Sequence, residues 1–140
     1  MQVTILAVGK LRDRSVAALC EDYLKRARRH LPVQIVECRN DAELLRRLPV
    51  EGQVVLLDAD GRVYDSPGFA RWLGQQMTYG RADLAFVVGG AAGLSDAVRE
   101  RGDAALSLGP MTLPHRLARV VLVEQIYRAL SILRGEPYHK

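Results

Sequence analysis

Cysteine and histidine, which form disulfides and most zinc sites, are scarce in this chain of 140 residues. The two cysteines, Cys20 and Cys38, lie eighteen positions apart and form no CxxC motif. The three histidines, His30, His115 and His139, are equally scattered. This spacing predicts no metal site, and it predicts two free thiols in a reducing compartment.

The sequence also lacks long apolar segments. Its longest apolar stretches, such as residues 3–8 and 120–123, fall far short of the ~20 residues that span a membrane. The first residues carry no signal-peptide pattern. With 49% apolar and 26% charged residues, the composition is that of an ordinary globular protein. We therefore expect a single cytoplasmic domain covering residues 1–140, with no membrane association.

Excess positive charge is confined to the first quarter of the chain. The formal net charge is +4, and residues 1–30 account for all of it, with seven Lys or Arg against three acidic residues. Residues 31–140 carry thirteen of each sign. This asymmetry favours a surface that faces a polyanion such as nucleic acid, although a solvated basic helix face gives the same pattern.

Hydrophobic periodicity predicts alternating strands and helices joined by short connections. Asp60-Gly61 is a turn signal, and Ser66-Pro67 is typical of a helix start. The alternation predicts a three-layer α/β/α domain with a mainly parallel sheet of five or six strands. The predicted strands cover residues 2–8, 33–38, 53–58, 82–88 and 103–108, and the predicted helices cover residues 15–29, 41–48, 66–77, 95–101 and 114–134.

The last predicted helix is apolar around most of its circumference, which is typical of a helix covered on both sides. In a domain of this size we interpret one covered side as a homodimer interface; a single helix deep in the core is the alternative. Val121 and Leu130 are candidates for the partner-facing side. The apolar side chains of this helix are Leu117, Val120, Val121, Leu122, Val123, Ile126, Tyr127, Leu130, Ile132 and Leu133.

Three segments follow predicted strands at the edge where parallel α/β sheets bind ligands. They are Leu57-Asp58, residues 89–93 with the sequence GGAAG, and residues 108–113. Glycines there allow the backbone to approach a ligand closely, although an ordinary glycine turn has the same composition. The chain has no GxxxxGK[ST], no GxGxxG after its first strand and no GxSxG. These absences argue against P-loop enzymes, ordinary NAD enzymes and α/β-hydrolases.

The C-terminal part of the chain is dense in polar side chains. Glu124 and Arg128 are spaced for an ion pair on one helix face. Tyr138, His139 and Lys140 end the chain, and by composition alone such an ending is a solvated tail.

These segments together resemble one known family. Residues 87–95, VVGGAAGLS, resemble the glycine-rich loop of the SPOUT methyltransferases. The ending has PHRLARV at 114–120, EQIYRA at 124–129 and GEPYHK at 135–140. It is closely similar to the ending of the bacterial 23S rRNA pseudouridine N3-methyltransferases, the large-subunit methyltransferase H family. The resemblance extends over the whole chain, including the opening VTILAVGK at residues 3–10.

The resemblance implies a C-terminal trefoil knot, S-adenosylmethionine as methyl donor, a homodimer, and 23S rRNA in the assembled ribosome as substrate. It implies His139 as the candidate base and Tyr138 as a residue that stacks on a base. Arg128 or Arg119 would stabilise the deprotonated base or bind a phosphate. The implied cofactor-binding residues are Leu57, Gly89, Leu108, Gly109, Pro110, Met111, Thr112 and Leu113.

Other functions fit the same residues. A non-catalytic RNA-binding or ribosome-associated protein would retain the cofactor site and lose the chemistry, and a nucleotide-binding regulatory domain is a third interpretation. For methyl transfer itself, two mechanisms stay open: one with an essential base, and one in which the enzyme only positions donor and acceptor.

Overall fold

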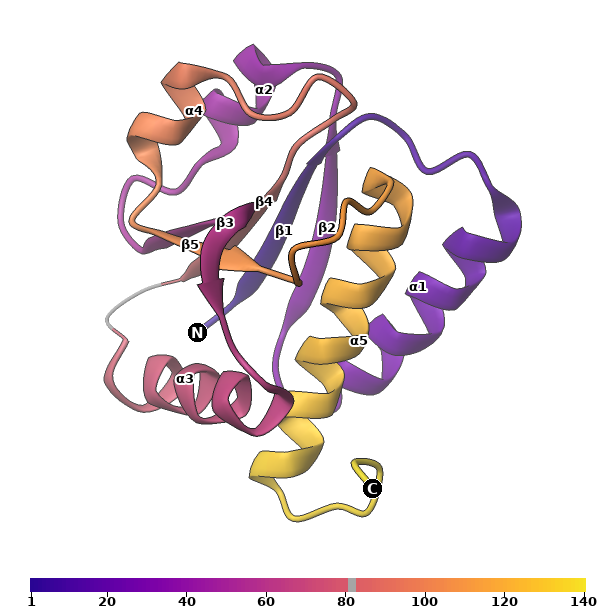
Figure 1. Ribbon diagram of the computed structural model, residues 1–140. Coiled ribbons are helices and arrows are strands. Elements are labelled where there is room, and N and C mark those ends of the chain that lie inside the picture. Colours follow the sequence, from indigo (N-terminus) through magenta and orange to yellow (C-terminus); the bar gives the residue numbers. More distant parts are fainter. Residues whose placement is uncertain (81–82) are drawn as a thin grey trace.

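The computed structural model describes residues 1–80 and 83–140, in which strands and helices alternate (Figure 1). The strands are β1 (Val3–Val8), β2 (Val33–Cys38), β3 (Gln53–Val63), β4 (Leu84–Val88) and β5 (Ala104–Ser107). The helices are α1 (Arg14–Ala27), α2 (Asp41–Arg47), α3 (Ser66–Tyr79), α4 (Asp96–Arg101) and α5 (His115–Leu133). The predicted alternation is confirmed, whereas the predicted start of the fourth strand at Ala82 lies outside the described residues.

Each strand runs parallel to its neighbours, in the order β2-β1-β4-β3-β5. The predicted parallel sheet is confirmed, with five strands in the described part of the chain. β1 lies inside the sheet and pairs with β4, where Val3 is opposite Leu84 and Ile5 is opposite Phe86. Because all strands run the same way, the loops that follow β1, β3, β4 and β5 emerge at one edge of the sheet.

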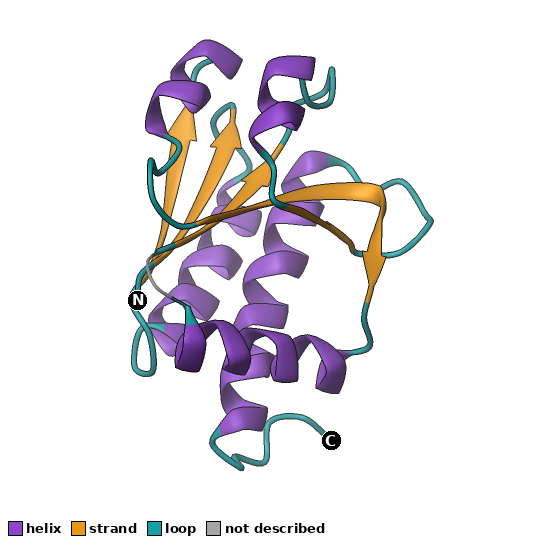
Figure 2. Ribbon diagram, turned by 90° about the vertical axis from the view of Figure 1, so that its left-hand side faces the viewer, coloured by secondary structure: helices purple, strands orange, loops and turns teal. Residues whose placement is uncertain are grey.

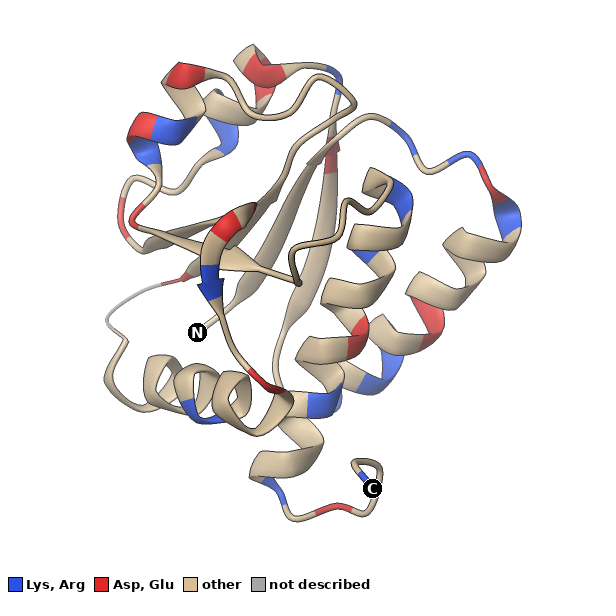
Figure 3. Ribbon diagram, in the orientation of Figure 1, with Lys and Arg blue, Asp and Glu red and all other residues tan. Residues whose placement is uncertain are grey.

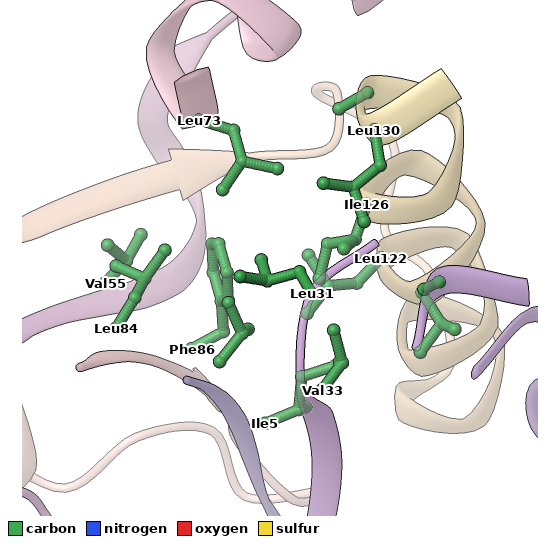
Figure 4. Packing of buried hydrophobic residues seen from close by; sticks show 14 of the residues in the cluster. Ile5, Leu31, Val33, Val55, Leu73, Leu84, Phe86, Leu122, Ile126 and Leu130 are labelled. Carbon is green, nitrogen blue, oxygen red and sulfur yellow. The ribbon is translucent and has the colours of Figure 1, made fainter. Parts of the chain in front are cut away.

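Helices cover both faces of the sheet, which gives the predicted three layers (Figure 2). Helices α1 and α3 each pack on α5, and the three share a large core with one face, including Ile5, Phe86 and Leu122 (Figure 4). Helices α2 and α4 cover the other face over a smaller core that contains Leu6 and Leu44. Neighbouring residues of β1 thus contribute to opposite cores, as the alternation of side chains along a strand requires.

The turn predicted at Asp60-Gly61 is wrong, because β3 continues through these residues to Val63. In the pairing of β3 with β5, Leu57 and Arg62 both lie opposite Leu106, so the register is interrupted at residues 58–61 of β3. Gly61 makes the continuation possible: a Cβ added there would lie 2.7 Å from the carbonyl carbon of Ala105. Gly61 is therefore needed because two strands approach closely there, and not because the chain turns. The dipeptide Asp-Gly alone does not distinguish these two reasons for a glycine.

Helix starts follow the sequence signals with one correction. The N-cap of α3 is Asp65, whose carboxylate accepts the Gly68 N–H at 2.7 Å, so the predicted cap residue Ser66 is the first helical residue instead. Ser95 caps α4 as predicted. The cap at Asp65 fixes where α3 begins after the extended β3, and so connects the sheet to the α1, α3 and α5 layer.

Replacing Gly61 with valine should lower the free energy of unfolding by about 1–3 kcal/mol, the usual cost of forcing extra volume into a packed site. The new side chain would collide with the β5 backbone at Ala105. Urea denaturation followed by circular dichroism measures the change. Val63→Thr in the same strand is the control, because Val63 is exposed and threonine is also β-branched. Equal stability of the two variants would contradict the tight β3–β5 approach.

The basic residues of the first quarter form two groups at opposite ends of α1 (Figure 3). Residues 10–14 precede and begin the helix, and residues 25–29 end it. A helix of 14 residues is about 21 Å long, so these groups are not one patch. The second group is partly neutralised, since Arg26 pairs with Asp22 at 3.3 Å. The predicted polyanion-facing surface therefore divides into two separate candidates.

Other expectations concern membranes, thiols and topology. No helix in the described ranges is long and apolar enough to cross a membrane. Cys20 and Cys38 are both free and buried. Burial raises the pKa of both thiols, which keeps them protonated and unreactive at neutral pH. The C-terminal trefoil knot stays a prediction from the resemblance.

Candidate functional site

A cavity of about 760 Å³ opens beside the middle of β3, at residues 57–59, and at the carboxyl ends of β4 and β5. Its volume is within the range of about 300–1,000 Å³ typical of small-molecule sites. The three segments predicted to bind a ligand all contribute to its wall, although Leu57-Asp58 lies within β3 and does not follow it. Seven of the eight predicted cofactor residues line this strand-end cavity, and the eighth, Pro110, does not. Those seven are Leu57, Gly89, Leu108, Gly109, Met111, Thr112 and Leu113.

Glycines expose backbone along the wall of the strand-end cavity. Gly93 and Gly109 have φ angles of 79° and 128°, which side chains other than glycine rarely adopt. Gly93 donates its N–H to the carbonyl of Gly90 at 2.9 Å and closes a tight turn after β4. A Cβ added at Gly109 would meet no atom within 4 Å, so its backbone borders open space. Both loops thus present bare peptide groups to a ligand.

An ion pair that sequence reasoning missed borders the same cavity. Arg99 of α4 donates from Nη1 to Oδ2 of Asp58 at 2.5 Å. The Asp60 N–H donates to Oδ1 of Asp58 at 2.9 Å, and with Arg99 it holds the pKa of Asp58 below its usual range. Asp58 is therefore ionised at neutral pH. The sequence gives no signal for this pair, because its partners lie far apart along the chain.

The lining suits a neutral or cationic organic ligand better than a nucleotide polyphosphate. Leu57, Met111 and Leu113 contribute apolar side chains, and Asp58 contributes a carboxylate next to its arginine partner. Among the described residues no group of three or more His, Cys, Asp or Glu is arranged for a metal ion. An apolar wall beside exposed peptide groups fits a flat base with polar edges, such as adenine, attached to a compact polar chain.

The predicted catalytic residues form a second group, the tail cluster, defined here as Tyr23, Glu124, Arg128, Tyr138 and His139. Glu124 lies at its centre. Its carboxylate accepts hydrogen bonds from the Tyr138 hydroxyl at 2.7 Å and from Arg128 Nη2 at 2.8 Å. The guanidinium of Arg128 also donates from Nη1 to Nδ1 of His139 at 2.9 Å. The ion pair predicted from the spacing of Glu124 and Arg128 is confirmed, and it connects the helix to the end of the chain.

Tyr138 is fixed by contacts on several sides. Its ring packs against Tyr127 with centroids 4.6 Å apart, and the Arg128 guanidinium lies 4.9 Å from its ring centre. Its hydroxyl also reaches that of Tyr23 on α1 at 3.4 Å. Burial, with hydrogen bonds to Tyr23 and Glu124, raises the pKa of Tyr138 far above its usual range. The tail is therefore anchored at Tyr138, which is partly buried, whereas residues 133–137, His139 and Lys140 are exposed.

Arg119, predicted as an alternative cation for the substrate, does not fill that role. Its side chain is 1% exposed and is directed to Glu37 at 2.6 Å and to the carbonyl of Gly9 at 3.1 Å. A guanidinium enclosed in this way cannot reach a substrate. The periodicity of α5 places residue 119 on the core side, but an arginine in a hydrophobic stripe is easily interpreted as functional.

The strand-end cavity and the tail cluster lie at different levels of α5. Ala118 lines the cavity, and Arg128 is ten residues further along the helix, which corresponds to about 15 Å. Figure 1 shows the chain end beyond the far end of α5, away from the loop that precedes this helix. Within one chain, the predicted catalytic residues are therefore not brought to the predicted cofactor residues.

Comparison with known proteins decides the family. A family model described as "Predicted SPOUT methyltransferase" matches residues 1–139. The chain belongs to the SPOUT methyltransferases. Its curated relatives are named ribosomal RNA large subunit methyltransferase H, as the resemblance implied. The relative from Rubrobacter xylanophilus is 47% identical, with 99% of this chain and 98% of that protein covered. The relative from Gemmatimonas aurantiaca is 43% identical, with both chains covered completely.

Solved SPOUT-type structures share the fold at low sequence identity. A probable methylase family protein from Haemophilus influenzae matches 99% of this chain and 70% of its own, with a TM-score of 0.60 and 10% identity. The SpoU methyltransferase AviRb from Streptomyces viridochromogenes, in complex with AdoMet, matches 96% of this chain and 59% of its own, with a TM-score of 0.50 and 16% identity. These likenesses confirm the α/β fold of the family.

Gly89→Val should lower the affinity for S-adenosylmethionine at least tenfold, equivalent to about 1.4 kcal/mol, while the protein stays folded. An added Cβ would lie 3.1 Å from the carbonyl carbon of Gly93 and from Leu94 Cδ2, so the turn after β4 must shift and the cavity wall with it. Isothermal titration measures the affinity. Ala92→Val is the matched control, because Ala92 is exposed in the same loop and does not line the cavity. Unchanged affinity in Gly89→Val would remove this loop from the site.

Proposed function

We propose that the chain is an S-adenosylmethionine-dependent methyltransferase that acts on N3 of a pseudouridine in 23S rRNA of the assembled ribosome. One observation carries the proposal. In a chain whose relatives are named ribosomal RNA large subunit methyltransferase H, two loops and the middle of β3 surround one cavity suited to that cofactor. We also propose that residues 1–140 are a single domain that works in the cytoplasm.

The cofactor would lie in the strand-end cavity. S-adenosylmethionine, when bound, supplies a methyl group on a positively charged sulfur. Peptide groups of residues 89–93 and 108–113 bind and orient it, and Leu57 and Leu113 pack against its adenine ring. The carboxylate of Asp58 favours a cationic ligand over an anionic one. The main contribution of these residues to the rate is the orientation of donor and acceptor.

The tail cluster would act on the acceptor base. N3 of pseudouridine carries a proton, so its lone pair reacts only after deprotonation. The ion pair with Glu124 raises the pKa of Arg128, which leaves Arg128 a permanent cation able to stabilise the resulting anion. Tyr138 is protonated and contributes an aromatic ring rather than a base. The catalytic assignment is therefore Arg128 for charge, Tyr138 for stacking and His139 for proton transfer.

The contact between Arg128 and His139 constrains the role of His139. A guanidinium can only donate hydrogen bonds, so Nδ1 of His139 accepts, and in the neutral ring Nε2 carries the proton. This ring has no free lone pair for a substrate proton while the contact lasts. Proton transfer to His139 therefore requires that Arg128 turn to the substrate first. If the contact persists in the complex, positioning and the charge of Arg128 account for catalysis.

We propose a homodimer in which each tail cluster serves the partner's cavity. Leu117, Val121, Glu124 and Arg128 follow one another along the side of α5 opposite its buried stripe. Leu117, in the first turn of α5, is 40% exposed and offers an apolar side chain to a partner. A two-fold axis across this stripe makes the helices antiparallel, so that the tail of one chain reaches the cavity of the other. Leu130, at 1% exposure, belongs to the core and not to this interface.

The deciding experiment compares ribosomal RNA from a deletion strain with that from its parent by mass spectrometry of nucleosides. The proposal expects the methyl group on one pseudouridine to vanish, and to return when purified protein and S-adenosylmethionine are added to the ribosomes. Cofactor binding without methyl transfer would favour a non-catalytic ribosome-binding protein. Absence of cofactor binding would favour a nucleotide-binding regulatory domain.

A further inference from the structure

Arg119 is a fully buried arginine that joins α5 to the loop after β1. Arginine is rarely buried without a partner, and here two partners account for its position. Nη1 donates to Oε2 of Glu37 at the end of β2, and Nη2 donates to the carbonyl of Gly9. Only the Arg119 end of this ion pair is buried, since the Glu37 side chain is 37% exposed, and the desolvation of the arginine offsets much of the attraction. The two contacts connect α5 to β2 and to the loop after β1, which points to a positioning task.

The same carboxylate fixes the loop at a second point. Oε2 of Glu37 accepts the backbone N–H of Leu11 at 2.7 Å. The N–H of Gly9 donates to the carbonyl of Cys38 at 2.8 Å, and its φ of 95° turns the chain out of the sheet there. Burial alone would raise the pKa of Glu37, but the hydrogen bond from Leu11 and the charge of Arg119 hold it below its usual range. Glu37 thus stays ionised at neutral pH.

The fixed segment, called here the basic loop (residues 9–14), carries three exposed cations. Lys10, Arg12 and Arg14 form no ion pair within the described ranges. The single acid among them, Asp13, is engaged as the N-cap of α1, where it accepts the Ser15 N–H at 2.9 Å. The basic loop therefore presents unneutralised positive charge on an anchored backbone.

The basic loop begins beside the strand-end cavity. A Cβ added at Gly90, which lines the cavity, would lie 3.3 Å from Cγ1 of Val8, the last residue of β1. On the other side Ala118, also in the cavity wall, directly precedes Arg119. The two segments that Arg119 connects, the end of β1 and the start of α5, are thus both next to the cavity proposed to hold the methyl donor. Figure 3 shows the loop's positive residues at the same end of the molecule as the start of α5.

We propose that the basic loop binds the phosphate backbone of the RNA that flanks the target base, and that Arg119 and Glu37 are positioning residues that fix this loop at the rim of the cavity. The inference rests on the proposed function and names the surface that takes its substrate. The basic group at the other end of α1 lies about 20 Å away and is assigned no part in it.

The first test removes the loop's charge without touching the cavity or the core. In a Lys10→Ala, Arg12→Ala and Arg14→Ala triple variant, KM for ribosomes from the deletion strain should rise at least tenfold, with kcat and the affinity for S-adenosylmethionine unchanged. Each lost phosphate contact should reduce the slope of log affinity against log salt by about 0.7–0.9, and so by about 2 in total.

A matched triple variant separates a local contact from net charge. Arg46→Ala, Arg71→Ala and Arg101→Ala remove three exposed arginines from α2, α3 and α4. If this control raises KM and lowers the salt slope as much as the loop variant does, the basic loop is not the RNA contact and the proposal fails.

The positioning role is tested by a cycle with Glu37→Gln, which keeps size and removes the charge that holds Arg119 and Leu11. Alone, this variant should raise KM for ribosomes about threefold or more, without changing kcat. In the background of the triple loop variant it should have no further effect, because the side chains that it positions are gone. Additive effects on KM, or a loss confined to thermal stability, would show that Glu37 and Arg119 only support the fold.

Failure of the inference can be told from failure of the proposed function. If the wild-type protein methylates ribosomes while both triple variants behave alike, only the loop assignment is wrong. If the wild-type protein does not methylate ribosomes at all, co-sedimentation with ribosomes at graded salt still measures the loop's contribution, and a slope equal to that of the control overturns the inference.

Discussion

Removing residues 138–140 should reduce methyl transfer to ribosomes by ~10²–10⁴-fold, the usual cost of losing a general acid or base, and leave cofactor affinity nearly unchanged. The deletion takes away Tyr138 and His139 and leaves Glu124 and Arg128 as an isolated ion pair. The strand-end cavity shares no residue with the deleted segment. Single-turnover kinetics with saturating cofactor measure the step, and isothermal titration measures the affinity.

A subunit-mixing experiment makes this prediction sharper. The deleted protein keeps an intact cavity, and Gly89→Val keeps an intact tail. The assay uses a cofactor concentration too low to load Gly89→Val. If the tail of one subunit completes the cavity of its partner, random mixing of the two proteins should then restore about a quarter of the wild-type activity. No restoration would mean that each tail works within its own chain. Normal activity of the deleted protein alone would mean that the end of the chain is a solvated tail.

His139→Ala separates proton transfer from the rest of the tail. This variant keeps Tyr138 and its bond to Glu124, so the tail stays anchored. A loss as large as that of the deletion would make His139 the base. A loss below tenfold would favour the positioning mechanism, in which the charge of Arg128 stabilises the deprotonated base.

Replacing both Leu117 and Val121 with glutamate should dissociate the dimer and abolish methyl transfer, while each chain stays folded. Both side chains lie on the side of α5 opposite its buried stripe, Leu117 exposed and Val121 partly buried, and four new carboxylates would face one another there across the two-fold axis. Sedimentation velocity at micromolar concentration should then give a species of 15.5 kDa. The affinity of the monomeric variant for the cofactor shows whether the cavity binds it without the partner subunit.

Two controls define the interface in this second experiment. Val50→Glu places a carboxylate on an apolar residue that is 98% exposed before β3, remote from α5, and should leave the dimer intact. Leu130→Glu should unfold the chain, because it buries a charge in the large core. A wild-type protein that sediments as a monomer would contradict the dimer, and with it the shared site.

The sequence predicts those parts of the fold that depend on local pattern. Period-two and period-3.6 alternation places the strands and helices, because each element has faces of different polarity. The same logic fails at Gly61, where the reason for glycine is a strand far along the chain at Ala105. It fails again at Arg119, whose burial depends on Glu37 from another strand. At both residues the deciding contact is with a residue far away in the sequence, and a local sequence pattern contains no information on such contacts.

In the candidate site, too, local patterns predict some features and miss those that depend on distant residues. Glycine-rich segments after parallel strands suffice to predict the strand-end cavity, because the topology brings those ends together. Spacing predicts the pair of Glu124 and Arg128, but it does not reveal that Tyr138 joins them, or that Tyr23 meets Tyr138 from α1. The contact of Arg99 with Asp58 also escapes prediction, because a charged residue on a short helix is most often solvated.

The order of the strands has a consequence for biosynthesis. β1 is synthesised first, and its neighbour β2 follows soon after in the sequence. Its other neighbour, β4, comes much later, so the edge of β1 at Val3 stays unpaired until Leu84 has been synthesised. β3 likewise waits for β5. A nascent chain therefore cannot complete its sheet until most of it has left the ribosome, and contacts between such distant segments form slowly. We expect refolding over milliseconds to seconds, and C-terminal truncations within β4 that yield insoluble protein rather than a smaller domain.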